Sequence, residues 1–458
     1  MMDEPTLEEW MDRHHVEVVR THATGLDGHA VGKYLRRSKF LKSLPKGHAI
    51  ADMSLAGDYT GQPHLTIWHE MRSGQFGDIL LKPDIDTIIS DGTDGDLGHV
   101  ICEFTSVDGD PLSLCPRTLL RRVTNEIGEL GYDVKASFEL EFFVYRDSFE
   151  NARRKGYKNL TPLTASRGSN IYLLRNAHNV KPFMDEVLKR LSWQKFEWES
   201  WSDEGGVSQV EINFSPTDPV RASDLIVRAR QIIYEVAVDL EMSVCFMPQM
   251  KAGFGSGLHI HHSLVEKDGT PAFFADGGRS ALMNDWIAGI VTTMAGSVSL
   301  LCPTINSYRR MQEFRAPPVT ATWGEENKSA GLRIISRAAN LARIEHRLPG
   351  GDANPYLVLA TILAGGLAGH RHQLPLRPEL KTVGWGLPDD VPKLPRTLLS
   401  AADALAEDNH LVDILGQDFV EYWIDSRKFE WLTYHSECGD TENKGTTDWE
   451  LQRYFELM

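Results

Sequence analysis

The chain has 458 residues, more than one simple hydrophobic core usually organises, so two or more domains are expected. Its composition is typical of globular proteins, with 41% hydrophobic and 24% charged residues. The formal net charge of −16 at pH 7 disfavours nucleic acid and anionic membrane surfaces as partners. No apolar run approaches the roughly 18 residues that a membrane-spanning helix requires.

The N-terminus and the cysteines indicate a reducing compartment. The first residues are acidic and contain no apolar stretch of the kind found in secretory signals. The five cysteines are scattered, with no CxxC pair, which disfavours a disulfide framework or a thiolate zinc site. We therefore expect a cytoplasmic protein.

Residues 1–105 mix a first helix with short strands and turns. Thr6 and Glu9 have the spacing of a capping box, so a helix is expected to start there. Residues 84–104 indicate two strands around the turn-rich segment "DGTDGD".

From about residue 110, longer helices alternate with strands. Residues 115–132 have helical apolar spacing and a glycine near the end. Asp218 and Asn354 each precede a proline, the pattern of an N-cap followed by proline at the first helical position. Residues 385–410 are typical of a proline-punctuated surface loop that leads into a helix.

Four segments alternate apolar and polar residues, as strands with two different faces do. Any one of them could belong to a half-exposed antiparallel sheet with a solvated face. Solvated faces usually carry Lys, Thr and Ser, whereas these four carry mainly Glu, His and Arg, which favours a lined polar cavity. The polar faces hold Glu139 and Glu141; Gln209, Glu211 and Asn213; His259 and His261; and Arg343, Glu345 and Arg347.

Carboxylate oxygens and imidazole nitrogens are ligands suited to Mg²⁺ or Mn²⁺. Neighbouring carboxylates such as Glu139 and Glu141 repel each other when both are ionised, and a divalent cation removes that penalty. Glu204 lies seven residues before Glu211, and the Gly-Gly pair after it lets backbone approach a ligand closely. More than three carboxylates predicts two cations, the arrangement that stabilises phosphoryl oxygens in transfer reactions.

Seven motifs occur in order: "FELEFF", "EGGVSQVEINF", "CFMPQ", "GSGLHIHHSL", "PTINSYRR", "ENKSAGLRI" and "RIEHRLPGGDANPYL". Together they resemble the glutamine synthetase family, from about residue 95 to the end and more weakly before it. The resemblance implies an α+β fold. Residues 1–108 would form a β-grasp-like N-terminal domain, and residues 109–458 a catalytic domain whose curved antiparallel sheet lines the active site.

The resemblance also implies roles for individual residues. One cation site would comprise Glu141, Glu204 and Glu211, and the other Glu139, His259 and Glu345. ATP would contact His261, Ser263, Lys328, Arg333 and Arg343. Glutamate would contact Gly255, Arg310 and Arg347, while Arg310 and Arg333 would act on the transferring phosphate. His262 points with the apolar face and is interpreted as structural.

The implied assembly is a large homo-oligomer, a double-ring dodecamer with active sites between subunits. Asp52 or Asp58 would reach the neighbouring site, and Asp52 fits the spacing to the following serine better. Turn formation is the alternative interpretation of both aspartates.

The implied reaction uses ATP and two or three Mg²⁺ or Mn²⁺ ions per site. ATP phosphorylates the γ-carboxylate of glutamate, and an amine then displaces the phosphate. The site must exclude water, because an acyl phosphate otherwise hydrolyses.

The flap segment "NSYRRMQEFRAPPV" departs from the family pattern. Glutamine synthetases proper carry a glutamate just before "AP", and Ala316 stands at that place here. Phe314 and Ala316 would offer apolar surface to a carbon-bearing amine, whereas Glu313 could replace the missing carboxylate only if the loop is shifted. A short alkylamine such as isopropylamine, ethylamine or methylamine is therefore the expected substrate.

Three other positions also depart from the pattern. Lys328 replaces an arginine, Phe254 replaces a common asparagine, and the loop near Trp385 lacks the tyrosine that many bacterial members adenylylate. The last difference suits a catabolic enzyme without nitrogen-status control. The alternatives are ammonia-dependent glutamine synthetase, γ-glutamylpolyamine synthetase, a non-catalytic family member and a metal-dependent hydrolase.

Overall fold

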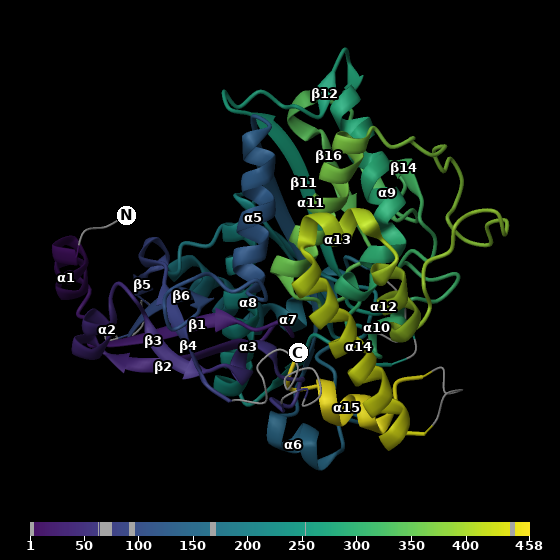
Figure 1. Ribbon diagram of the computed structural model, residues 1–458. Helices are drawn as coiled ribbons and strands as arrows, with labels where there is room; N and C mark the ends of the chain where they lie inside the picture. The colour runs from purple at the N-terminus through teal and green to yellow at the C-terminus, as the bar shows by residue number, and fades with distance from the viewer. Residues whose placement is uncertain are drawn as a thin grey trace.

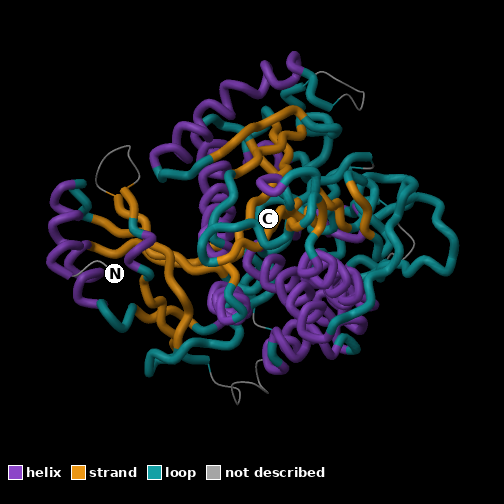
Figure 2. Tube along the Cα trace, turned by 90° about the horizontal axis from the view of Figure 1, so that it is seen from above, coloured by secondary structure: helices purple, strands orange, loops and turns teal. Residues whose placement is uncertain are grey.

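The structure is a computed structural model (Figure 1) that describes residues 4–62, 64, 76–90, 97–164, 171–251, 253–439 and 445–458. Within these ranges, residues 18–105 build one large β-sheet and residues 132–346 build another. Figure 2 shows the strands of the first sheet to one side of the second sheet and its helices. The domain boundary predicted at residues 108 and 109 falls in the connection between the two sheets and stays a prediction.

The first sheet has the order β2-β1-β6-β4-β3 in the described chain, with β5 paired to β6. Strand β1 is antiparallel to β2 and parallel to β6, and β4 is antiparallel to both β3 and β6. The strands are β1 (Val18–Thr24), β2 (Ala30–Arg36), β3 (His48–Ala51), β4 (Asp78–Pro83), β5 (Ile89–Ser90) and β6 (Leu97–Thr105).

Two predictions for the N-terminal region have different outcomes. The two strands predicted in residues 84–104 are confirmed as β5 and β6, which pair antiparallel, and the turn between them lies outside the described residues. Helix α1 (Glu4–Arg13) begins before Thr6, so the predicted cap at Thr6 is wrong. A proline in the first helical turn, as at residue 5, is compatible with that earlier start. Helices α2 (Arg37–Ser43) and α3 (Met53–Ala56) follow.

The second sheet has the order β14-β15-β16-β11-β7-β9-β8 among the described residues, with β10 paired to β7. Its neighbours are antiparallel except for the parallel pair β14 and β15. The strands are β7 (Tyr132–Tyr145), β8 (Trp198–Asp203), β9 (Gln209–Phe214), β10 (Ser243–Cys245), β11 (Leu258–Glu266), β14 (Trp323–Glu325), β15 (Leu332–Ile335) and β16 (Arg343–His346). A separate hairpin joins β12 (Phe274–Ala275) to β13 (Gly278–Arg279).

The helix starts predicted at Asp218 and Asn354 are confirmed. The Asp218 carboxylate accepts hydrogen bonds from the backbone at the start of α8, and the Asn354 side chain does so for α11. The helix after the proline-punctuated loop begins at Leu398. The remaining long helices are α5 (Pro116–Glu129), α7 (Leu174–Trp193), α8 (Pro219–Asp239), α9 (Ala281–Leu301), α11 (Pro355–His372) and α14 (Gln417–Glu437). The shorter ones are α6 (Phe149–Arg154), α10 (Ser307–Arg310), α12 (Leu398–Ala406), α13 (Asn409–Leu415) and α15 (Asp448–Tyr454).

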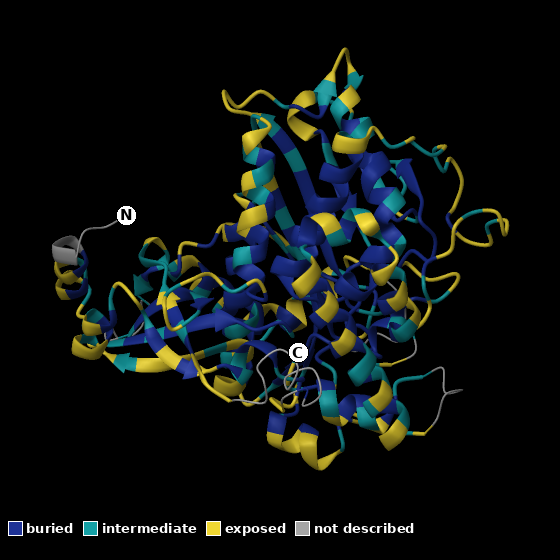
Figure 3. Ribbon diagram, viewed as in Figure 1, coloured by how far each residue is buried: buried dark blue, intermediate teal, exposed yellow. Residues whose placement is uncertain are grey.

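Helices cover the apolar face of the second sheet and leave its polar face for the site. Helices α5 and α8 contact β7, whose Phe138, Leu140 and Phe142 are buried. Figure 3 shows the centre of the molecule mostly in dark blue, the colour of buried residues. Helix α11 packs against α5, α8 and α9. None of the described helices is long and apolar enough to cross a membrane.

Candidate active site

The polar faces of four neighbouring strands meet on one side of the second sheet. Glu139 of β7 lies opposite His259 of β11, and Glu141 lies opposite Glu211 of β9. Glu345 of β16 lies opposite His261. Residues directly opposite each other on paired strands have neighbouring side chains, so the register brings distant parts of the chain together. The lined polar cavity predicted from the alternation is confirmed.

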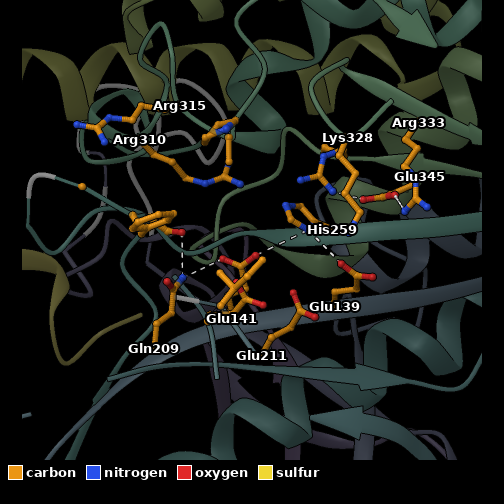
Figure 4. Close-up of a pocket in the computed structure, with 18 of the residues that line it drawn as sticks. Glu139, Glu141, Gln209, Glu211, His259, Arg310, Arg315, Lys328, Arg333 and Glu345 are labelled. Atoms are coloured by element: carbon orange, nitrogen blue, oxygen red, sulfur yellow. Dashed lines mark hydrogen bonds and ion pairs between the residues drawn. The ribbon is translucent and has the colours of Figure 1, made fainter. Parts of the chain in front are cut away.

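The cavity has a volume of about 410 Å³. Its wall includes the six predicted cation ligands, and Figure 4 shows most of them pointing toward one another. His259 Nδ1 lies 3.1 Å from Glu139 Oε2 and 3.8 Å from Glu141 Oε1, and His261 Nε2 lies 2.9 Å from Glu139 Oε1.

Two groups of donor atoms come close enough to share a cation. Glu139, His259 and Glu345 offer atoms within 4.8 Å of one another, and this set is the same as one of the two predicted cation sites. Glu141, Glu211 and His259 form the other, with the imidazole where Glu204 was predicted. Glu204 lies on the same cavity wall, where one of its carboxylate oxygens accepts a hydrogen bond of 3.3 Å from the Gly205 backbone N–H.

The charges of this cluster fit a divalent cation. Burial, together with repulsion from Glu141, raises the pKa of Glu204 to about 7. Burial and repulsion from Glu139 and Glu141 raise the pKa of Glu211 to about 9. Burial also opposes ionisation of Glu139, but the hydrogen bonds from His259 and His261 outweigh it and lower its pKa. Clustered carboxylates with one imidazole are the donor set of Mg²⁺ or Mn²⁺.

Three predicted arginines line the same cavity, and each has an N–H group without a hydrogen-bond partner in the described chain. The Nε atoms of Arg310, Arg333 and Arg347 are buried and have no hydrogen-bond partner in the described chain. Arg333 donates to Glu345 at 3.0 Å, Arg347 also donates to Glu345, and Arg310 donates to the Leu348 carbonyl at 2.8 Å. Unpaired guanidinium donors beside a carboxylate cluster suit an anionic ligand, such as a phosphate or a substrate carboxylate.

The predicted nucleotide contacts are not all placed on this wall. Lys328 and Arg333 line the cavity, whereas His261, Ser263 and Arg343 are not among its described lining residues. Arg343 Nε donates to His261 Nδ1 at 3.2 Å, so these two form a pair next to the Glu139 carboxylate.

Gly255, a predicted glutamate contact, lies where a side chain would not fit. A methyl group there would come within 2.9 Å of the Arg310 Cγ atom and would collide with the Pro248 carbonyl. Gln209 was not singled out as a site residue, although it shares the polar face of Glu211. Its amide donates to Glu141 Oε2 and to the Gly255 carbonyl, both at 3.0 Å.

Asp52 and Asp58 both make polar contacts within their own chain. Asp52 accepts a hydrogen bond of 3.0 Å from the Gly77 backbone, and Asp58 forms an ion pair of 2.9 Å with Arg453. Both are buried, and neither is among the described residues that line the cavity. The predicted reach into a neighbouring subunit remains a prediction.

The flap residues Phe314 and Ala316 line the cavity together with Phe254 and Trp385. Glu313 is not on this wall: its carboxylate accepts a hydrogen bond of 2.8 Å from the Gly386 backbone. The Trp385 indole donates to the Arg315 carbonyl, also at 2.8 Å. These two bonds join the flap to residues 384–386, a contact for which the sequence carries no local signal.

A model of the glutamine synthetase catalytic domain matches residues 113–454. A glutamate–isopropylamine ligase of a Pseudomonas species is 29% identical, and the match covers 98% of this chain and 97% of that protein. A γ-glutamylethanolamide synthetase of Streptomyces coelicolor is 30% identical over 84% of this chain and 80% of its own length.

Among solved structures, a complex of GmaS with ADP is similar with a TM-score of 0.84 at 24% identity, covering 99% of each chain. This likeness confirms the predicted α+β fold. Members of the matched family depend on ATP and a divalent metal, and they use glutamate with ammonia or an amine. Since the family model spans residues 113–454, the chain belongs to the glutamine synthetase family and is a glutamate–amine ligase.

Proposed function

We propose that this protein joins the γ-carboxylate of glutamate to a short primary alkylamine, such as isopropylamine, ethylamine or methylamine. The observation that carries the proposal is the flap wall, where Phe314 and Ala316 line the cavity and the Glu313 carboxylate is bonded to Gly386 instead. Burying an alkyl group on this wall is worth about 0.8 kcal/mol per CH₂, a gain that ammonium does not have. The names of the isopropylamine and ethanolamide relatives support an amine substrate.

The carboxylate cluster would hold the cations of the site. Glu139, His259 and Glu345 would bind one Mg²⁺ or Mn²⁺, and Glu141, Glu204 and Glu211 a second, with two or three ions in all. When bound, these ions neutralise charge on phosphoryl oxygens.

Residues around the metal-binding cluster would bind the two anionic substrates, glutamate and ATP. Gly255, Arg310 and Arg347 would orient glutamate. His261, Ser263, Lys328, Arg333 and Arg343 would bind ATP. Arg310 and Arg333 would offset the negative charge that develops during phosphoryl transfer. Lys328 keeps a positive charge there but lacks the two-pronged geometry of an arginine.

The reaction would proceed in two displacements. An oxygen of the glutamate γ-carboxylate attacks the γ-phosphorus of ATP, and ADP leaves. The neutral amine nitrogen then attacks the acyl carbon, phosphate leaves, and the nitrogen gives up one proton to form the amide. Phe254, Phe314 and Trp385 would exclude water from the acyl phosphate during its lifetime.

The proposed assembly is a double-ring dodecamer in which Asp52 or Asp58 completes the site of a neighbouring subunit. Light scattering of the purified protein tests the ring, and a monomer with full activity would contradict the shared site.

The test of the function is phosphate release from ATP with glutamate and Mg²⁺ across ammonium, methylamine, ethylamine, isopropylamine, aniline, putrescine and spermidine. We expect one of the alkylamines to exceed ammonium at least tenfold in kcat/KM. A higher value for ammonium would identify a glutamine synthetase and overturn the amine assignment. A higher value for putrescine or spermidine would identify a polyamine ligase, and no turnover with any amine would overturn catalysis itself.

A further inference from the structure

A buried polar cluster connects the C-terminal helix α15 to two segments of the active-site wall. Its members are Glu450 of α15, Asn306 at the start of α10, and Gln249, and each has at most 4% of its surface exposed. None of the three is among the described lining residues of the active-site cavity. Gly255 and Arg310, which follow Gln249 and Asn306 along the chain, do line it.

The Asn306 side chain bridges the two wall segments. Its Oδ1 accepts the Gln249 backbone N–H at 2.8 Å, and its Nδ2 donates to the Gln249 carbonyl at 3.0 Å. Two bonds to one residue fix both its distance and its orientation. The segments then pack tightly, because a methyl group at Gly255 would come within 2.9 Å of both Arg310 Cγ and Gln249 Oε1. A shift of the bridge would therefore move Gly255 relative to Arg310.

Glu450 fixes the direction of this bridging amide. Its Oε1 accepts a hydrogen bond of 2.9 Å from Asn306 Nδ2. Its Oε2 accepts the backbone N–H and the hydroxyl of Thr447 at 2.9 and 2.8 Å, and Arg309 Nη2 lies 3.4 Å from it. A carboxylate offers only acceptors, so an amide turned the other way would place its own oxygen against Glu450. Glu450 thereby selects the orientation in which Asn306 holds Gln249.

Thr446 makes a second link from the same end of the chain. Its hydroxyl donates to the Gln249 carbonyl at 2.7 Å, so this oxygen accepts from both Thr446 and Asn306. The segment that carries Thr446 and Glu450 therefore holds one peptide group of the active-site wall by a direct bond and through the bridging amide.

We propose that Glu450, together with Thr446, is a positioning residue for the glutamate substrate. It acts through the Asn306 amide, which sets where Gly255 and Arg310 lie. This inference rests on the proposed function, in which those two residues orient glutamate. Strands β11, β15 and β16 carry most of the proposed ATP contacts, and the cluster is built from other segments, so nucleotide binding should not depend on it.

Isothermal titration of the full chain with glutamate, in the presence of Mg²⁺ and ADP, tests this role without any amine. Glu450→Gln keeps the shape, but the introduced amide must turn an N–H toward either Asn306 or the Thr447 backbone N–H. We expect the Kd of glutamate to rise at least fivefold in Glu450→Gln and at least twofold in Thr446→Val. The Kd of ADP, titrated separately, should stay within twofold of the wild-type value in both variants.

Steady-state kinetics with the best amine should show the same division between the substrates. We expect Glu450→Gln to raise KM for glutamate at least fivefold and to leave KM for ATP within twofold of the wild-type value. A general loss of stability would not separate the two substrates in this way.

The matched control is Glu456→Gln. Glu456 lies on the same terminal segment and ties it to α6, accepting hydrogen bonds from Arg153 at 2.7 Å and from the Tyr157 hydroxyl at 2.8 Å. This variant should keep the wild-type Kd for glutamate. An equal rise in Glu456→Gln, or an equal loss of ADP affinity in Glu450→Gln, would indicate general loosening of the segment and overturn the proposal.

An unchanged Kd for glutamate in Glu450→Gln would also overturn it. If that variant does not fold, Thr446→Val decides, because Thr446 is only half-buried and valine has a similar shape. An unchanged Kd in Thr446→Val would then overturn the proposal. A wild-type protein that binds no glutamate would overturn the proposed function, and this inference with it, so the two failures give different results.

Discussion

At the scale of single residues, Glu345 is a nearly fully buried carboxylate held between two arginines. It accepts hydrogen bonds from Arg333 and Arg347, and its carboxylate lies within 4.8 Å of donor atoms of Glu139 and His259. Glu345→Gln keeps the shape but removes the charge that balances two arginines and would bind a cation. We expect a loss of about 100-fold or more in kcat/KM, together with the loss of one bound Mn²⁺ per chain in equilibrium titration.

Glu325→Gln is the matched control for this change. Glu325 pairs with Arg279 and Ser336 and does not line the described cavity, so its variant should keep near-normal activity and Mn²⁺ binding. A Glu345→Gln enzyme with full Mn²⁺ stoichiometry and activity within threefold of the wild type would contradict the assignment of Glu345.

For Glu313, in contrast to Glu345, we expect removal of the carboxylate to have only a small effect on activity. Its carboxylate accepts a hydrogen bond from the Gly386 N–H, and the second bond between the two loops, from Trp385 to Arg315, does not involve Glu313. Glu313→Ala should therefore lower kcat by less than about threefold and raise KM mainly for the amine, because one neutral–charged hydrogen bond is lost. Steady-state kinetics with each substrate varied in turn checks this. An inactive Glu313→Ala enzyme with intact Mn²⁺ binding would mean that this carboxylate takes part in the reaction.

At the scale of elements, the contact between α9 and α11 depends on glycines at the crossing. A methyl group at Gly289 of α9 would collide with the backbone of Gly365 and come within 2.6 Å of the Gly369 Cα atom. Gly289→Ala should therefore destabilise the protein by about 2 kcal/mol through overpacking, despite the better helix propensity of alanine. Thermal unfolding measures the effect. Gly128→Ala on α5 is the control, since its methyl group would meet only Lys267 Nζ, at 3.9 Å, and should be neutral or stabilising.

Within single strands and helices, the sequence predicted the features that depend on local patterns. Alternation along β7, β9, β11 and β16 is a local pattern with a period of two, so it identified the polar faces. Most residues of these faces line the cavity, whereas Asn213, His261 and Arg343 are not among its described lining residues. The caps at Asp218 and Asn354 were equally local. The bond between Glu313 and Gly386 joins residues 73 positions apart, and no periodicity reports it.

Burial of a charge is the other feature that local patterns miss. Arg228 lies in helix α8 and donates to the Thr87 carbonyl of the N-terminal region. Its guanidinium is therefore buried by tertiary packing, which no pattern within α8 predicts. The start of α1 was also mispredicted. Thr6 and Glu9 have capping-box spacing, but the helix begins two residues earlier, at Glu4.

At the scale of the whole molecule, the active-site carboxylates couple cation binding to stability. Glu204 and Glu211 have pKa values raised to about 7 and about 9, against about 4.3 for an unperturbed glutamate. In the cation-free protein the unfolded chain releases these protons above about pH 4.3, while the folded state keeps them. The folded state therefore loses stability as pH rises from about 4.3 to about 9, the window between the unfolded and folded pKa values.

A divalent cation takes the place of these protons and competes with them at low pH. Mn²⁺ should therefore raise the unfolding temperature more at pH 8.5 than at pH 5.5, each compared with a sample containing EDTA. Glu211→Gln should reduce the pH dependence of the EDTA sample, because it removes the carboxyl whose pKa is raised most. An Mn²⁺ shift of equal size at both pH values would contradict this coupling, since it would mean that the cation binds where no proton is displaced.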